Sequence, residues 1–144
     1  QLVDVVAVNH YCLHADITVA DLSDTRAELE RLSSGAAGRP VVFQEFGCPA
    51  GELLGSSDEF QAGWFTEAFA AIEDDPQVRA AFVFEFSDWS ADLVSANYGA
   101  AIAAEPELAD FFARFEDWLL TTGLVRHDLT TRPAWQVYLD QLSS

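Results

Sequence analysis

Three apolar segments, separated by segments with helical patterns, most constrain how this chain can fold. Val, Ala and Phe dominate residues 2–11 (LVDVVAVNHY), 41–46 (VVFQEF) and 78–90 (VRAAFVFEFSDWS). Near-continuous apolar runs of this length are typical of strands that are covered on both faces. We therefore expect three buried β-strands.

Amphipathic helices are expected between and after these strands, over residues 18–34, 56–75, 105–123 and 132–142. Ser57 is a suitable cap at the start of the second helix, and Pro76 ends it. Pro106 and Gly123 mark the start and the end of the third. Residues 91–104 are expected to form a long, Ala-rich connection. Buried strands that alternate with helices predict a parallel sheet with the helices outside it.

The charge composition makes some classes of binding partner unexpected. The net charge is −17, with 24 acidic residues, seven Arg and no Lys. Such a chain repels phosphates, so neither nucleic acid nor an anionic membrane is an expected partner. Because strand-like sequence begins directly after Gln1, we expect residues 1–144 to be a single partial domain of a longer protein. The sequence does not decide the cellular compartment, and an extracellular location is compatible with it.

Polar and aromatic side chains gather where the three strands end. These are Asn9, His10, Tyr11 and Cys12, then Gln44, Glu45 and Cys48, then Glu85, Asp88 and Trp89. Parallel α/β folds bind ligands at this edge of the sheet. Burying an unpaired carboxylate costs several kcal/mol, so we expect Glu45 to point into a pocket. The alternative is that Glu45 pairs with an Arg or with a helix terminus.

Taken together, VDVVAVNHY, VVFQEFG, FVFEFSDWS and the tail GLVRHDLTTRPAWQVYL resemble the last three strands and the C-terminus of clan A glycoside hydrolases, similar to family 5. The resemblance covers the whole chain but only half of such a protein. It implies the C-terminal part of a TIM (β/α)8 barrel, about strands 6–8 with their helices. It also implies an O-glycosyl hydrolase that cleaves β-glycosidic bonds in a polysaccharide or oligosaccharide with retention of configuration.

The resemblance implies a role for each residue at the strand ends. Glu45 is the expected nucleophile, and Tyr11 is expected to orient it by a hydrogen bond that favours the ionised carboxylate. Asn9, His10 and Asp88 are expected to bind the sugar, and Trp89 to stack on a pyranose face. The simpler alternatives are rim aromatics for Tyr11 and Trp89, and loop hydrogen bonds for Asn9 and His10. Glu85 is expected to face the helices and bind Arg79 or Arg126.

A retaining glycosidase needs a second carboxyl group about 5–5.5 Å from the nucleophile. In the clan this acid/base Glu follows an Asn at the end of the fourth strand, and the sequence contains no Asn-Glu pair. We therefore expect the acid/base and the N-terminal half of the barrel to lie upstream, and the isolated chain to be inactive. No cofactor is implied.

Cys12 and Cys48 follow the ends of the first two strands. Neighbouring strands lie about 4.8 Å apart, so a disulfide between them is within reach. Two packed thiols are the favoured interpretation.

Two other functions remain open. A carbohydrate-binding barrel without catalysis would keep Tyr11 and Trp89 and lack the acid/base. A metal-dependent hydrolase would use His10, His14, Glu45 and Asp88 as ligands, although the His-x-His pair usual in such barrels does not occur in the sequence.

Overall fold

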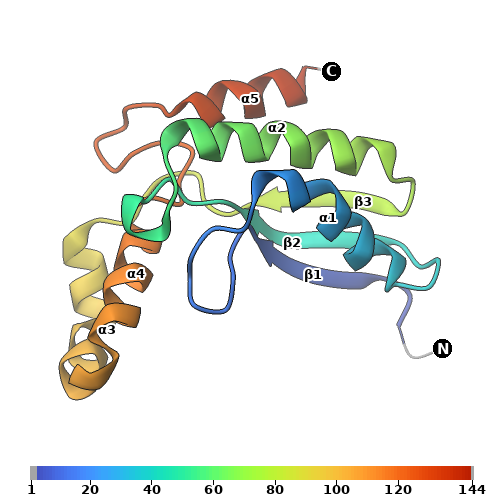
Figure 1. The fold of residues 1–144 in the computed structure, drawn as a ribbon. Helices are drawn as coiled ribbons and strands as arrows, with labels where there is room; N and C mark the ends of the chain where they lie inside the picture. The colour runs from blue at the N-terminus through green and yellow to red at the C-terminus, as the bar shows by residue number, and fades with distance from the viewer. Residues whose placement is uncertain (1–2, 144) are drawn as a thin grey trace.

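A computed structural model describes residues 3–143, which form a three-stranded sheet with helices on one of its faces (Figure 1). The strands are parallel in the order β1-β2-β3. The elements are β1 (Val6–Tyr11), η1 (Leu22–Asp24), α1 (Thr25–Ser34), β2 (Val41–Gly47), η2 (Glu52–Leu54), α2 (Asp58–Asp74), β3 (Val78–Val83), α3 (Ala91–Ala104), η3 (Pro106–Leu108), α4 (Ala109–Leu119) and α5 (Pro133–Leu142). The expected parallel sheet is confirmed. Leu2, part of the first expected strand, lies outside the described residues.

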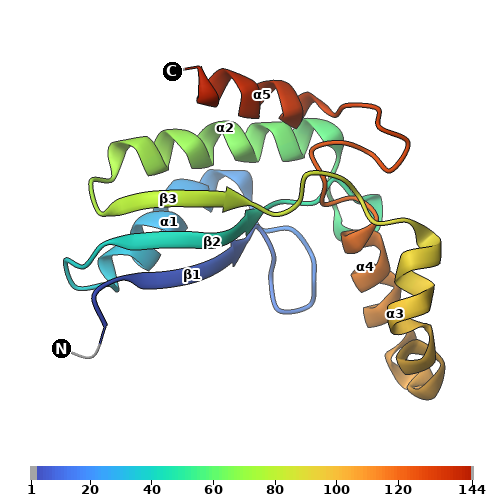
Figure 2. The same cartoon turned by 180° about the vertical axis from the view of Figure 1, so that it is seen from behind.

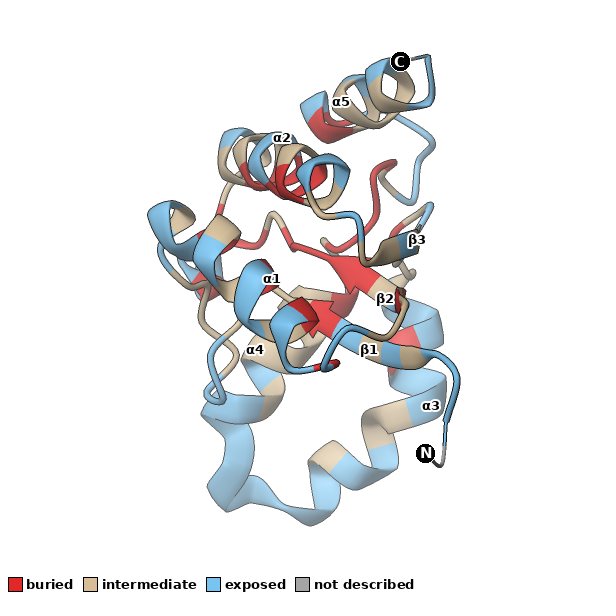
Figure 3. Cartoon of the chain, turned by 90° about the vertical axis from the view of Figure 1, so that its right-hand side faces the viewer, coloured by how far each residue is buried: buried red, intermediate tan, exposed pale blue. Residues whose placement is uncertain are grey.

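The hydrophobic core lies between the sheet and the helices α1, α2 and α5. Val41, Phe43 and Phe46 of β2 are fully buried there and meet Trp64 and Phe65 of α2. Figure 3 shows the buried residues gathered between β2 and α2. Alternate side chains of a strand point to opposite faces, so one face of each strand supplies this core.

The opposite face of the sheet is uncovered, contrary to the expectation of strands buried on both faces. Ala7 and Asn9 of β1 are exposed, and Phe82 of β3 is 60% exposed. The helices α1, α2 and α5 lie together on the other side (Figures 1 and 2). The apolar composition of these strands therefore exceeds what the described part of the chain buries.

The helices differ from the expected ones at two places. Residues 91–104, expected as a connection, form helix α3, which Ser90 caps by accepting a hydrogen bond from the Leu93 amide. The helix expected over 18–34 begins only at Thr25, because Val19 is held in the preceding loop by a backbone hydrogen bond to Leu54. Helices α3 and α4 form a hairpin that extends beyond the C-terminal ends of the strands (Figures 1 and 2). Among the described residues, helices fall short of the length and apolarity needed to cross a membrane.

Arg132 ties the C-terminal tail to the segment that follows β3. Its guanidinium donates to both carboxylate oxygens of Asp88, at 2.8 and 2.9 Å, and to the Gly123 carbonyl at 3.0 Å. It also contacts Asp58 of α2 at 3.1 Å. Arg132 and Asp88 are both buried, so each charge depends on the other.

We expect Arg132→Ala to lower the free energy of unfolding by about 3–5 kcal/mol, because Asp88 would stay buried without its partner. The matched control is Arg126→Ala, which also removes a contact with Asp58 but whose side chain is 38% exposed. That change should cost about 0–1 kcal/mol. Denaturant unfolding followed by circular dichroism measures both, and equal losses would contradict a dominant role for the buried pair.

Candidate active site

One extra residue in β2 turns Glu45 toward the uncovered face of the sheet. Val8 pairs with Phe43 and Asn9 with Glu45, so Gln44 has no partner in β1. Without this irregularity, Glu45 would share the core face of Phe43, two residues earlier. With it, Phe46 instead faces the core, and Glu45 lies on the side of Asn9 and Tyr11. Glu45 therefore points away from the core, as expected, and its entry into a pocket stays a prediction.

Tyr11 and Glu45 form a short hydrogen bond at the C-terminal edge of the sheet. The Tyr11 hydroxyl donates to Glu45 Oε2 at 2.5 Å. Burial raises the pKa of Tyr11 far above its usual value, and the hydrogen bond to Glu45 and the charges of Glu45 and Glu85 raise it further. Tyr11 therefore stays protonated and acts only as a donor to the carboxylate. This hydrogen bond fixes the orientation of the Glu45 carboxylate.

Glu85 and Trp89 form a second pair close to Tyr11. The Trp89 indole N–H donates to Glu85 Oε1 at 2.7 Å, and the Trp89 ring packs on Tyr98 of α3 with centroids 6.1 Å apart. The expectation that Glu85 binds Arg79 or Arg126 is wrong, because its carboxylate accepts from Trp89 instead. Burial raises the pKa of Glu85, partly offset by the Trp89 hydrogen bond. A second carboxyl group with raised proton affinity thus lies beside the Tyr11–Glu45 pair.

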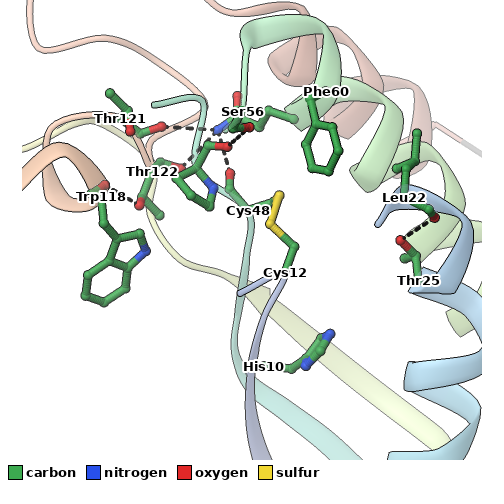
Figure 4. The surroundings of a disulfide bond; sticks show 12 residues. His10, Cys12, Leu22, Thr25, Cys48, Ser56, Phe60, Trp118, Thr121 and Thr122 are labelled. Carbon is green, nitrogen blue, oxygen red and sulfur yellow. Dashed lines mark hydrogen bonds between the residues drawn. A yellow bond between two sulfur atoms is a disulfide. The ribbon is translucent and has the colours of Figure 1, made fainter. Parts of the chain in front are cut away.

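A disulfide joins the chain directly after β1 to the chain directly after β2 (Figure 4). Cys12 and Cys48 are bonded, with their Cα atoms 5.1 Å apart, and both are buried. The interpretation of two packed thiols is therefore wrong. Gln61 of α2, fully buried, donates to the Cys48 carbonyl at 2.8 Å, a role that its position in a helical pattern did not reveal.

Gly47, between Glu45 and Cys48, has to be glycine because β2 approaches the chain after β3 closely there. A Cβ atom on Gly47 would collide with the Phe84 carbonyl oxygen. The close approach brings the Phe84 ring against Tyr11, edge to face, at 5.8 Å.

The expected sugar-binding residues fall in different places. Asn9 is exposed and lies opposite Glu45 in the strand register. The His10 ring packs among Phe43, Phe46 and Trp64 of the core. Figure 4 shows His10 directed toward α1, where Glu28 is 4.0 Å away; burial lowers the pKa of His10. His10 is thus separated from the face that carries Glu45.

Asp88 and the proposed metal ligands are likewise dispersed. Asp88 is engaged by Arg132 and by the Gly123 amide, which donates to it at 2.8 Å. His14 is exposed in the loop after β1. Within residues 3–143, groups of three or more His, Cys, Asp and Glu side chains that could hold a metal ion do not occur.

Helix α4 adds aromatic residues that the sequence pattern did not assign to the site. The Trp118 ring meets Tyr11 edge to face at 5.2 Å and stacks on Phe84 at 6.2 Å. Phe115 follows at 5.7 Å from Trp118. Pro106 and Gly123 indicated a helix over residues 105–123, and only the position of the α3–α4 hairpin brings Trp118 next to Tyr11.

Comparisons with known proteins identify the fold. No protein-family model matches this sequence, and no curated protein matches it at a significant level. The structure is similar to part of a β-glucuronidase from Bifidobacterium dentium complexed with coumarin-3-O-glucuronide, with TM-score 0.65 and 19% identity, over 99% of this chain and 21% of that one.

Two further solved structures are also similar. A GH2 β-galacturonidase from Eisenbergiella tayi gives TM-score 0.61 and 16% identity, over 98% of this chain and 24% of that one. A GH5_18 protein from Streptomyces cattleya in complex with GlcNAc gives TM-score 0.61 and 19% identity, over 85% and 26%. The chain spans about a quarter or less of the length of these proteins. It therefore has the fold of a fragment of glycoside hydrolases.

We expect loss of the disulfide to destabilise the protein by about 2–4 kcal/mol, because 36 residues separate the two cysteines and the unfolded chain gains freedom when the loop opens. Cys12→Ser combined with Cys48→Ser tests this by denaturant unfolding. Reduction of the wild type should reproduce the loss and leave the double variant unchanged. Alkylation of both cysteines in the unreduced protein, measured as an increase in mass, would contradict the disulfide itself.

We expect Glu85→Gln to stabilise the protein at neutral pH and not at acidic pH. The pKa of Glu85 is raised on folding, so its contribution is present below the unfolded-state pKa and lost as pH rises through the folded-state value. Gln can still accept from Trp89 and carries no charge. Glu85 is only partly buried, so water screens its charge and the gain should stay below about 1 kcal/mol. Unfolding of both proteins between pH 3 and 8 measures it, and a difference independent of pH would contradict the cause given.

Proposed function

We propose that this chain is the nucleophile-bearing part of a retaining β-glycosidase, with Glu45 as the nucleophile. The observation that carries the proposal is the 2.5 Å hydrogen bond from Tyr11 to Glu45. It lies at the C-terminal edge of a parallel sheet, where barrel enzymes place their catalytic residues. The similarity in fold to parts of glycoside hydrolases supports the same reading.

In this proposal one Glu45 oxygen attacks the anomeric carbon of the bound sugar while the glycosidic bond breaks. A second carboxyl group protonates the departing oxygen, and water then hydrolyses the glycosyl ester with net retention. The Tyr11 hydroxyl donates to Glu45 Oε2. In the proposal, this hydrogen bond orients Glu45 and leaves its other oxygen to attack. Asn9 and Trp89 are proposed to bind the sugar. The proposal leaves out His10 and Asp88, whose side chains are engaged elsewhere.

We also propose that a further part of the same protein covers the open face of the sheet and supplies the acid/base carboxyl group. Exposed Phe82, together with Ala7 and Asn9, supports this, since parallel sheets are normally covered on both faces. Residues 1–144 would then be one partial domain, about the last three strands of a (β/α)8 barrel. The isolated chain should not cleave glycosides, and cleavage by it would contradict this point.

Glu45→Gln in the full-length protein should lower kcat by several orders of magnitude with little change in sugar affinity, because the amide cannot form the glycosyl ester. Tyr11→Phe should lower kcat by about 10- to 100-fold, the size of one hydrogen bond to a charged group. Turnover of aryl β-glycosides and calorimetric binding measure the two effects. Proton NMR of the first-formed product should show the β-anomer.

Glu59→Gln is the matched control, because Glu59 is an exposed carboxylate on α2 and should tolerate the same substitution. Turnover by Glu45→Gln at the wild-type rate would exclude Glu45 as the nucleophile. Sugar binding without any turnover in the full-length wild type would favour a carbohydrate-binding barrel instead.

A further inference from the structure

Two aromatic rings from distant parts of the chain hold the ring of Tyr11. Trp118 of α4 meets it edge to face, with centroids 5.2 Å apart and an interplanar angle of 85°. Phe84, which follows β3, meets it at 5.8 Å and 83°. Trp118 and Phe84 also stack on each other at 6.2 Å. The Tyr11 ring therefore packs against two rings that support each other.

The orientation of this ring decides where the Tyr11 hydroxyl lies. Strand β1 fixes the backbone of Tyr11, but its side chain can still adopt different rotamers. A hydrogen bond weakens steeply when it is bent, so the 2.5 Å bond to Glu45 Oε2 requires one position of the ring. Edge-to-face pairs favour such a defined geometry. Contacts with the Tyr11 ring thus control how well its hydroxyl holds Glu45.

Trp118 is itself fixed by an anchor between α4 and the segment that follows β2. The carboxylate of Asp117, its neighbour in α4, accepts a hydrogen bond from the Leu53 amide of η2 at 3.1 Å. Helix α4 approaches this segment so closely that a Cβ atom on Gly51 would collide with the Asp117 carboxylate. The chain that follows Glu45 therefore sets the position of the helix that carries Trp118.

The indole N–H of Trp118 takes no part in this arrangement. It is buried and has no hydrogen-bond partner within residues 3–143. Trp118 contacts Tyr11 and Phe84 through its ring, so the flat aromatic surface matters here and the donor does not. A phenylalanine at this position should therefore preserve the contact with Tyr11, whereas an aliphatic side chain should not.

We propose that Trp118 is a positioning residue for the reaction, which acts through the Tyr11 ring on the orientation of Glu45. This rests on the proposed function. The effect of Trp118 should appear in the rate at which Glu45 attacks and not in the affinity for the sugar. It should also disappear when Tyr11 has no hydroxyl group to orient.

A double-mutant cycle in the full-length protein tests this on an aryl β-glycoside with a poor leaving group, so that attack by Glu45 limits turnover. Trp118→Leu should lower kcat about 3- to 10-fold, the size of one edge-to-face contact, and change KM less than about two-fold. In a Tyr11→Phe background the same substitution should lower kcat less than about two-fold, because residues that act as a unit are not additive. Trp118→Phe should restore most of kcat, since it keeps a ring.

Phe112→Leu is the matched control, because Phe112 lies on the same helix and its ring packs on Phe111; it should leave kcat unchanged. If circular dichroism shows that Trp118→Leu does not fold, Trp118→Met replaces it, since Met adapts to irregular space without a ring. Equal losses of kcat in the wild-type and Tyr11→Phe backgrounds would overturn the proposal. So would no loss, a change in KM alone, or the same loss in Phe112→Leu.

Failure of the underlying function has a different signature. The wild type would then not cleave the glycoside, or Glu45→Gln would cleave it at the wild-type rate. A wild type in which Glu45 and the Tyr11 hydroxyl are needed and Trp118 is neutral would reject the positioning role alone.

Discussion

The direction in which Glu45 points depends on one unpaired residue in β2. A strand alternates its side chains between two faces, and β2 has to place both Phe43 and Phe46 in the core. Phe46 lies three positions after Phe43, and a regular strand would place two such residues on opposite faces. The register shift at Gln44 resolves the conflict and leaves Glu45 on the open side. The same register shift therefore places both Phe rings in the core and turns the Glu45 carboxylate to the opposite face.

The side chains around Glu45 are held by several independent links between neighbouring strand ends. Tyr11 reaches across from β1 to Glu45, and the next residue, Cys12, is bonded to Cys48. Gln61 holds the Cys48 carbonyl from α2. Because these links join β1, β2 and α2, a movement of one strand end would disturb all of them. Such rigidity is what the proposed role of Glu45 as a nucleophile would require.

The two carboxyl groups near Tyr11 have different surroundings. Glu45 accepts a hydrogen bond from a phenol whose own pKa is raised, whereas Glu85 is bonded to the Trp89 indole and has a pKa raised by burial. In the described part of the chain, the arginines that form ion pairs do so with Asp and Glu side chains elsewhere, such as the Arg132–Asp88 pair. The surroundings of Tyr11 are therefore acidic and aromatic. The α3–α4 hairpin extends this character away from the sheet.

Apolar runs and their alternation with helical patterns were enough to predict the parallel sheet, the position of Glu45 at a strand end and its neighbourhood with Tyr11, because these depend on local chain properties and on sheet geometry. The direction of His10 toward α1 and the ion pair of Asp88 with Arg132 were decided by tertiary packing. So were the Cys12–Cys48 bond, helix α3 and the approach of Trp118 to Tyr11. A polar residue at a strand end can face either side of the sheet, and only the contacts made by segments distant in sequence determine which face is lower in free energy.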